Sequence, residues 1–138
     1  MNRYFDIALN LASDRFSGER DKVIADALIH NVNYFNIVCS SLNELDFVKD
    51  LNDRYKQNSC FTLGVHPHNA NELNEDSLKF LKDSIKLHQP SAVGETGLDF
   101  FRNLSTFENQ LNAFEQQIIL SIENNLPCLL YTSPSPRD

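Results

Sequence analysis

The chain has 138 residues, of which 41% are hydrophobic and 22% are charged, a composition typical of one globular domain. Its formal net charge of -7 argues against a broad basic surface for gripping nucleic acid, because such binding relies on lysine and arginine to neutralise phosphates. An acidic protein can still act on phosphate esters when a bound cation supplies positive charge locally.

The cysteines and the hydropathy pattern indicate the compartment. Cys39, Cys60 and Cys128 are an odd number without a Cys-x-x-Cys pair, which favours buried thiols in a reducing compartment over a disulfide framework. Asp6 places a charge near the amino terminus, and no later stretch approaches the ~20 apolar residues of a membrane span. We therefore expect a soluble cytoplasmic protein that makes no membrane contact.

Short apolar runs alternate with longer amphipathic runs along the chain. The apolar runs predict strands over residues 4–9, 34–39, 60–65 and 91–93, and from Pro127 onward. The amphipathic runs predict helices over residues 18–30 with Ser17 as the cap, after Ser41–Glu44, after Asn74, and after Ser105–Thr106–Phe107–Glu108. In the last helix we expect Leu111, Phe114, Ile118 and Ile122 to face inward.

Strict alternation of strands and helices predicts an α/β fold with a parallel sheet. Two forms compete, a doubly wound sheet and part of an eight-fold barrel; a complete barrel needs ~250 residues, about twice this length. The polar residues help to choose, because they follow different strands at their carboxyl ends. They are Asn10, Ser40, His66 with His68, and Glu95 with Asp99. Those ends converge on one mouth only in a barrel, so we favour the barrel.

The segment Gly94–Asp99 presents a carboxylate. A short apolar strand leads into Gly94, Glu95 follows at its carboxyl end, and Gly97 allows the backbone to turn just beyond. Ligands and metals bind at such strand ends in parallel α/β folds, which makes Glu95 a candidate functional residue. On spacing alone, a role in capping the next turn is an equally good interpretation.

The His66–Pro67–His68 segment is the second candidate. Pro67 favours an extended backbone at His66, and side chains two residues apart on an extended segment point the same way. Two imidazoles directed at one point suit a divalent metal or a phosphate oxygen. Loop or structural histidines remain the alternative for an isolated motif of this kind.

Three motifs together resemble the TatD family of metal-dependent deoxyribonucleases. They are Asp6-Ile7-Ala8-Leu9-Asn10-Leu11, Gly64-Val65-His66-Pro67-His68 and Gly94-Glu95-Thr96-Gly97-Leu98-Asp99-Phe100. The resemblance runs from about Tyr4 to Pro127. It implies the N-terminal half of a TIM-like (β/α)8 metal-dependent hydrolase barrel, truncated in the fifth strand. The implied activity is hydrolysis of DNA phosphodiesters, as an exonuclease, with Mg²⁺ as the expected metal and Mn²⁺ or Zn²⁺ as alternatives.

The resemblance also implies roles for individual residues. Glu95 matches the family's bridging metal ligand, and His66 matches the residue near the scissile phosphate, so these two are the expected catalytic residues. The expected substrate-binding residues are Asn10, His66, His68, Asp99 and Arg102.

The sequence departs from the family pattern at two places. Many relatives carry His-x-His at the end of the first strand, where this chain has Ala8-Leu9-Asn10, so the number of metals is left open. After the fifth strand begins, Tyr131 stands at the place of a metal-binding His, and the family's later His and Asp ligands are absent.

The ending, residues 128–138, resembles the translation of a transposase-type sequencing adapter. We therefore expect residues 1–127 to form a partial TatD-like domain and Cys128–Asp138 to be a non-native tail. A natural flexible tail is the alternative, which Ser-Pro-Ser-Pro also suits. Recovery of the same ending from unadapted genomic template would refute the hypothesis.

The expected function is that of a nuclease whose activity is weak or absent in this chain as written. Other ester or amide hydrolysis on the same scaffold, such as removal of misattached amino acids from transfer RNA, is one alternative. An inactive fragment or a binding module is the other, and a binding module predicts no effect of divalent metals.

Overall fold

A computed structural model describes residues 2–132 as five strands and four helices in alternation. The strands are β1 (Tyr4–Leu9), β2 (Val32–Ile37), β3 (Ser59–Leu63), β4 (Ala92–Leu98) and β5 (Cys128–Thr132). The helices are α1 (Arg20–Ile29), α2 (Leu45–Arg54), α3 (Glu75–His88) and α4 (Phe107–Glu123). Short 3-10 turns precede α1, α2 and α3 at Asp14–Phe16, Leu42–Glu44 and Pro67–Glu72.

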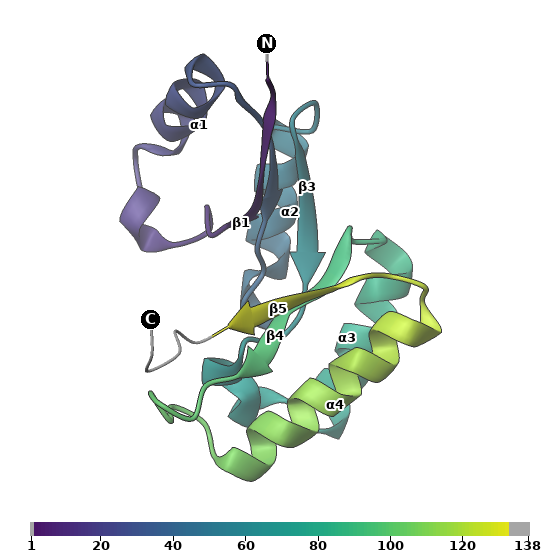
Figure 1. Cartoon of the computed structure of the whole chain (residues 1–138). Coiled ribbons are helices and arrows are strands. Elements are labelled where there is room, and N and C mark those ends of the chain that lie inside the picture. Colours follow the sequence, from purple (N-terminus) through teal and green to yellow (C-terminus); the bar gives the residue numbers. More distant parts are fainter. Residues whose placement is uncertain (1, 133–138) are drawn as a thin grey trace.

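All neighbouring strands pair in parallel, and their order in the sheet is β1-β2-β3-β4-β5. A doubly wound sheet would reverse its strand order at a switch point, whereas consecutive strands lie side by side in a (β/α)8 barrel. Figure 1 shows the sheet turning steeply from β1 to β5, with α4 packed beside β4 and β5. The predicted half barrel is confirmed.

The hydrophobic core lies between the sheet and its helices. Phe35, Ile37 and Leu63 of the central strands are fully buried against Val48 of α2 and Leu81 of α3. The run from residue 35 to residue 39 is buried throughout, as expected for a strand covered on both faces. The central strands therefore hold the carboxyl ends of the sheet rigidly in place.

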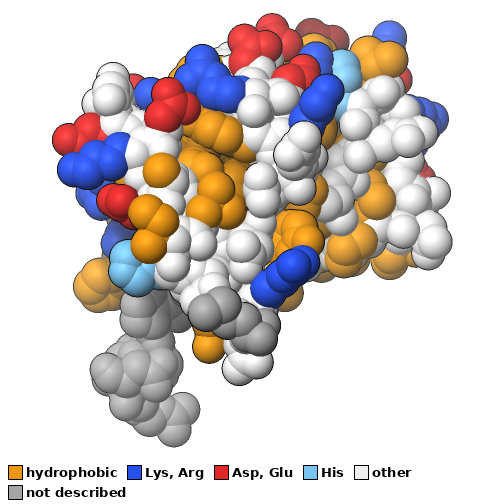
Figure 2. All heavy atoms as spheres, turned by 90° about the horizontal axis from the view of Figure 1, so that it is seen from above, with side chains coloured by type: hydrophobic (Ala, Val, Ile, Leu, Met, Phe, Trp, Pro, Cys, Tyr) orange, Lys and Arg blue, Asp and Glu red, His pale blue; other side chains and the backbone are white. Residues whose placement is uncertain are grey.

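The edge strand β1 is different, because Tyr4, Phe5 and Ile7 are each at least half exposed. Its other neighbour in a closed barrel would be the last strand, and no strand of residues 2–132 occupies that side. Figure 2 shows hydrophobic side chains reaching the surface in groups between charged ones. An apolar edge strand of this kind favours association with another chain.

Three sequence predictions about local structure are wrong in detail. Glu95 lies inside a longer β4 and not beyond the strand. Thr106, and not Ser105, caps α4 by accepting the backbone N–H of Asn109. On α1, Ser17 makes no cap, since the helix begins after Glu19.

The buried face of α4 was predicted correctly only in part. Ile122 is 73% exposed and Leu111 is 41% exposed, whereas Phe114 and Ile118 are partly buried. The fully buried residues of α4 are Gln110, Ala113, Gln117, Leu120 and Ser121. The buried face is shifted from the predicted hydrophobic stripe because it carries two amides that satisfy backbone groups of Val65 and Asp99.

The ending that we predicted to be non-native falls partly within the described residues. Cys128–Thr132 form β5 and pair with β4, whereas the remaining residues, 133–138, lie outside the described part of the chain. The domain boundary at residue 127 therefore falls at the start of β5, and the foreign origin of this ending stays a prediction. No helix within residues 2–132 is long and apolar enough to cross a membrane.

Candidate active site at the carboxyl ends of the strands

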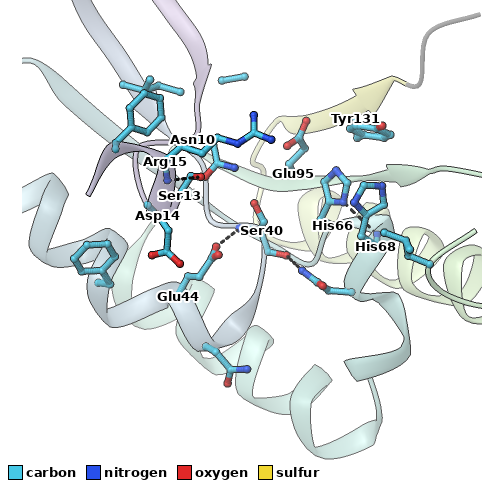
Figure 3. Close-up of a pocket in the computed structure, with 18 of the residues that line it drawn as sticks. Asn10, Ser13, Asp14, Arg15, Ser40, Glu44, His66, His68, Glu95 and Tyr131 are labelled. Atoms are coloured by element: carbon cyan, nitrogen blue, oxygen red, sulfur yellow. Dashed lines mark hydrogen bonds between the residues drawn. The ribbon is translucent and has the colours of Figure 1, made fainter. Parts of the chain in front are cut away.

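A pocket of about 1180 Å³ opens at the carboxyl ends of the strands (Figure 3). The predicted site residues that line it are Asn10, His66, His68, Glu95 and Arg102. Ser40, which follows β2, and Tyr131 of β5 line the same pocket. The polar residues thus converge on one mouth, as the barrel interpretation required.

Glu95 reaches the pocket because β4 carries one extra residue at this point. Gly94 pairs with Leu129 and Thr96 pairs with Leu130, so two consecutive residues of β5 face a stretch of three in β4. Such a bulge redirects a side chain, which is why bulges occur near functional sites. Burial raises the pKa of the Glu95 carboxyl, and the nearby His68 opposes that rise.

His66 lies three residues beyond the end of β3 and is 8% exposed. Its Nδ1 accepts the backbone N–H of His68 at 3.1 Å. Burial, and then the proximity of His68, lower the pKa of His66 to about 4, so the ring is neutral at pH 7. A neutral imidazole whose Nδ1 is an acceptor carries its proton on Nε2. His66 is thereby a fixed hydrogen-bond donor.

Asp99 lies behind the pocket wall and is not among the residues that line it. Its Oδ2 is 2.7 Å from His68 Nε2 and accepts the Tyr131 hydroxyl at 3.1 Å, and its Oδ1 accepts the Arg102 N–H at 3.0 Å. Burial alone would raise the pKa of Asp99, but these hydrogen bonds outweigh it and lower the pKa to about 2. Asp99 therefore orients His68 and Tyr131 from behind.

Two glutamines of α4, missed by sequence reasoning, hold the strand ends together. Gln117 bonds to the N–H and C=O of Val65, immediately before His66, and donates to Thr96 Oγ1, immediately after Glu95. Seven residues earlier, Gln110 accepts the backbone N–H of Asp99 and donates back to its C=O. Their spacing places both on one helix face, a signal readable as a polar stripe within the apolar pattern.

The loop after β1 forms the opposite wall and depends on Arg20, which was also missed. The Arg20 guanidinium donates to the backbone carbonyls of Leu11, Ala12 and Ser13 at 2.9 to 3.4 Å. It also lies over the Phe47 ring, 4.9 Å from the centroid. This planar fork fixes the segment that brings Arg15 to the pocket beside Asn10 (Figure 3).

The donors for a metal ion are few. Within the described residues, no group of three or more His, Cys, Asp or Glu side chains is placed to hold one. Glu95 offers a carboxylate in the pocket, whereas His66 Nδ1 and His68 Nε2 are engaged in hydrogen bonds. Mg²⁺ is often held by one or two carboxylates with water and substrate phosphates completing its shell. Among these side chains, the Glu95 carboxylate is the group that could bind a metal ion, as a single protein ligand.

Comparison with known proteins agrees with this geometry. The sequence profile of the family described as TatD related DNase matches residues 5–134. The chain belongs to this family. A curated relative from Pantoea ananatis, named 3'-5' ssDNA/RNA exonuclease TatD, is 36% identical over 127 residues, which cover 92% of this chain and 49% of the relative.

Solved structures of TatD-like proteins share the fold. A TatD homologue from Escherichia coli superposes with a TM-score of 0.85 at 26% identity, covering 93% of this chain and 50% of the other. A Saccharomyces cerevisiae protein described as an uncharacterised amidohydrolase gives 0.82 at 25% identity, covering 94% and 48%. The chain thus spans about half the length of the relatives it matches. Membership of this group of hydrolases supports a divalent metal cofactor in general.

Proposed function

We propose that this TatD-family chain carries one half of the active site of a metal-dependent exonuclease that hydrolyses phosphodiesters of single-stranded DNA or RNA. The observation that carries the proposal is the placing of Glu95, on its bulge, in the same pocket as the neutral donor His66. The names of the curated relatives support the substrate and the direction of hydrolysis. They favour this function over deacylation of transfer RNA.

The chemistry follows from the charges of the pocket. Glu95 would hold a divalent metal ion, Mg²⁺ in our proposal, and the bound ion would supply an activated water and neutralise charge on the phosphate. His66 donates from Nε2 to a phosphate oxygen, and a neutral donor does this without titrating near pH 7. Arg102 and Arg15 line the same pocket and bring positive charge to an otherwise acidic chain. We place Asn10 and His68 at the substrate as well, with Asp99 acting through His68.

The chain by itself holds a metal weakly under this proposal. One carboxylate from the protein leaves the ion mostly hydrated, and metal affinity depends on the number and geometry of the protein ligands. We therefore expect the 138-residue chain to hydrolyse nucleic acid at a rate close to background. We also propose that the protein is cytoplasmic.

Calorimetric titration with Mg²⁺, Mn²⁺ and Zn²⁺ tests the metal site, and degradation of a 3'-labelled oligonucleotide tests the reaction. We expect weak metal binding that is lost in Glu95→Gln and kept in Glu115→Gln, a matched change on the exposed side of α4. Equal metal binding by both variants would remove Glu95 from the site. Cleavage of an aminoacyl ester in preference to the oligonucleotide would favour the deacylase function instead.

Strong hydrolysis of the oligonucleotide by the unaltered chain, abolished in Glu95→Gln, would contradict the weak activity that we propose. It would show that residues 1–138 contain a sufficient site.

A further inference from the structure

An exposed group of apolar side chains follows β4, next to the pocket. Phe101 is 88% exposed, Leu104 is 62% exposed, and Phe100 and Phe107 are each about half exposed. Phe100 and Phe107 pack on each other with ring centroids 4.7 Å apart. We call these four residues the aromatic loop. Exposing large apolar side chains together is unfavourable in water, so a cluster of this kind indicates a binding surface.

Hydrogen bonds tie the aromatic loop to the candidate active site. The buried Asp99 Oδ1 accepts the backbone N–H of Phe101 at 3.2 Å and that of Arg102 at 3.0 Å. The other oxygen of the same carboxylate contacts His68. Arg102 and Leu104 of this segment both line the pocket. The exposed ring of Phe101 is therefore next in sequence to a cationic pocket residue.

Two kinds of partner suit a rigid exposed ring, an apolar protein surface and a planar ligand. The charge beside it distinguishes them. Arg102 follows Phe101 in the sequence, and Arg102 and Leu104 both line a pocket to which we assign phosphate chemistry. Bases of a single strand stack on exposed aromatic rings while nearby arginine or lysine contacts the backbone phosphates. Every base has a flat face, so such a contact tolerates any sequence.

We infer that the aromatic loop is a stacking platform for an unpaired base of the nucleic-acid substrate, with Phe101 as its principal ring. This inference rests on the proposed function and adds how the strand is held beside the pocket. It also accounts for a single-strand preference, because a paired and stacked base cannot offer its face to a protein ring.

The test uses the absence of tryptophan from this chain. Phe101→Trp introduces one fluorophore at the platform, and a short oligothymidylate is added in the presence of EDTA so that no hydrolysis is needed. We expect saturable quenching of the Trp fluorescence. The matched control is Phe80→Trp on α3, where Phe80 is 50% exposed, and we expect no quenching there.

A second measurement uses fluorescence anisotropy of a labelled oligothymidylate. We expect Phe101→Ala to weaken its binding about tenfold, in line with loss of one stacked base, and Phe101→Tyr to restore it. Phe80→Ala should leave the affinity unchanged. Circular dichroism confirms that each variant is folded.

The outcomes separate this inference from the proposed function. Binding of the oligonucleotide that is indifferent to Phe101→Ala would overturn the platform and leave the nuclease proposal standing. Absence of oligonucleotide binding in every variant would overturn the platform, whereas the metal titration of Glu95→Gln decides the proposed function separately. A change of oligomeric state on Phe101→Ala, without any change in oligonucleotide affinity, would show that the loop contacts another copy of the chain, and would also overturn the inference.

Discussion

The side-chain amide of Gln117 bonds to both the backbone N–H and the backbone C=O of Val65, at 2.7 and 3.0 Å. Val65 immediately precedes His66. Gln117 therefore fixes the backbone that positions the His66 side chain in the pocket. Gly64 is part of the same arrangement, since a Cβ there would lie 2.7 Å from Gln117 Oε1. The close packing of α4 on the end of β3 thus has a polar and a steric component.

Replacing Gln117 with leucine should lower the free energy of unfolding by about 2–4 kcal/mol, because the buried N–H and C=O of Val65 would lose their partner. Denaturant titration measures the loss. Gln116→Leu on the same helix, at a half-buried position, should stay within about 0.5 kcal/mol of the parent. Equal effects of the two changes would show that the amide contacts of Gln117 contribute nothing specific.

The stability of the fold should fall as the pH is lowered from about 6.5 to 4, because of His66. Its pKa is about 4 when folded and near 6.5 when unfolded, so the unfolded chain binds the extra proton first. The change amounts to about 2–3 kcal/mol across this window and levels off below it. Denaturant titrations at several pH values measure it.

The matched variants for that measurement are two histidine substitutions. His66→Gln should remove most of the pH dependence in this window, whereas His30→Gln, at an exposed position after α1, should preserve it. A pH dependence that survives in His66→Gln would mean that other groups cause it.

Gly94 should tolerate no side chain. Its φ is +139°, and an added Cβ would lie 2.4 Å from the backbone oxygen of Leu129 in β5. Gly94→Ala should therefore lower stability by about 2–5 kcal/mol, since β4 and β5 would have to separate. Gly18→Ala, with φ of +78° and open space around the new Cβ, should lose only about 1–2 kcal/mol. Thermal unfolding of both variants isolates the steric component.

Arg20→Lys should loosen the loop that forms one wall of the pocket. The lysine keeps the charge but lacks the fork that contacts three carbonyls, so residues 11–16 should exchange their amide hydrogens faster. Hydrogen exchange read by mass spectrometry measures this. Lys22→Arg, at an exposed position two residues after Arg20, serves as the control and should leave the exchange of that loop unchanged.

The chain should self-associate as its concentration rises, through the exposed strand β1. Ile7→Lys should reduce that association, because a charge on an edge strand opposes pairing with another strand. Ile29→Lys changes an isoleucine on α1 that is even more exposed than Ile7, and it should have little effect. Light scattering after gel filtration measures the mass, and association that is insensitive to Ile7→Lys would place the contact elsewhere.

Much of this protein could be read from the sequence because the deciding signals are local. Period-two and helical patterns gave the alternation of strands and helices, and an acid after an apolar run gave Glu95. Pro67 between two histidines pointed to His66 and His68, and both line the pocket. Polar residues after successive strands were enough to choose the barrel over the doubly wound sheet.

What only the tertiary structure decided depends on contacts distant in sequence. The bulge that directs Glu95 exists because β4 pairs out of step with β5, and no pattern within β4 states the register of its neighbour. Gln110 and Gln117 face inward where hydrophobic periodicity placed Leu111 and Ile122, because polar groups at the ends of β3 and β4 need hydrogen-bond partners. Hydrophobic periodicity predicts which apolar side chains are buried. It cannot predict that a polar side chain is buried in order to bond the backbone of another segment, because that need arises only when the segments pack together.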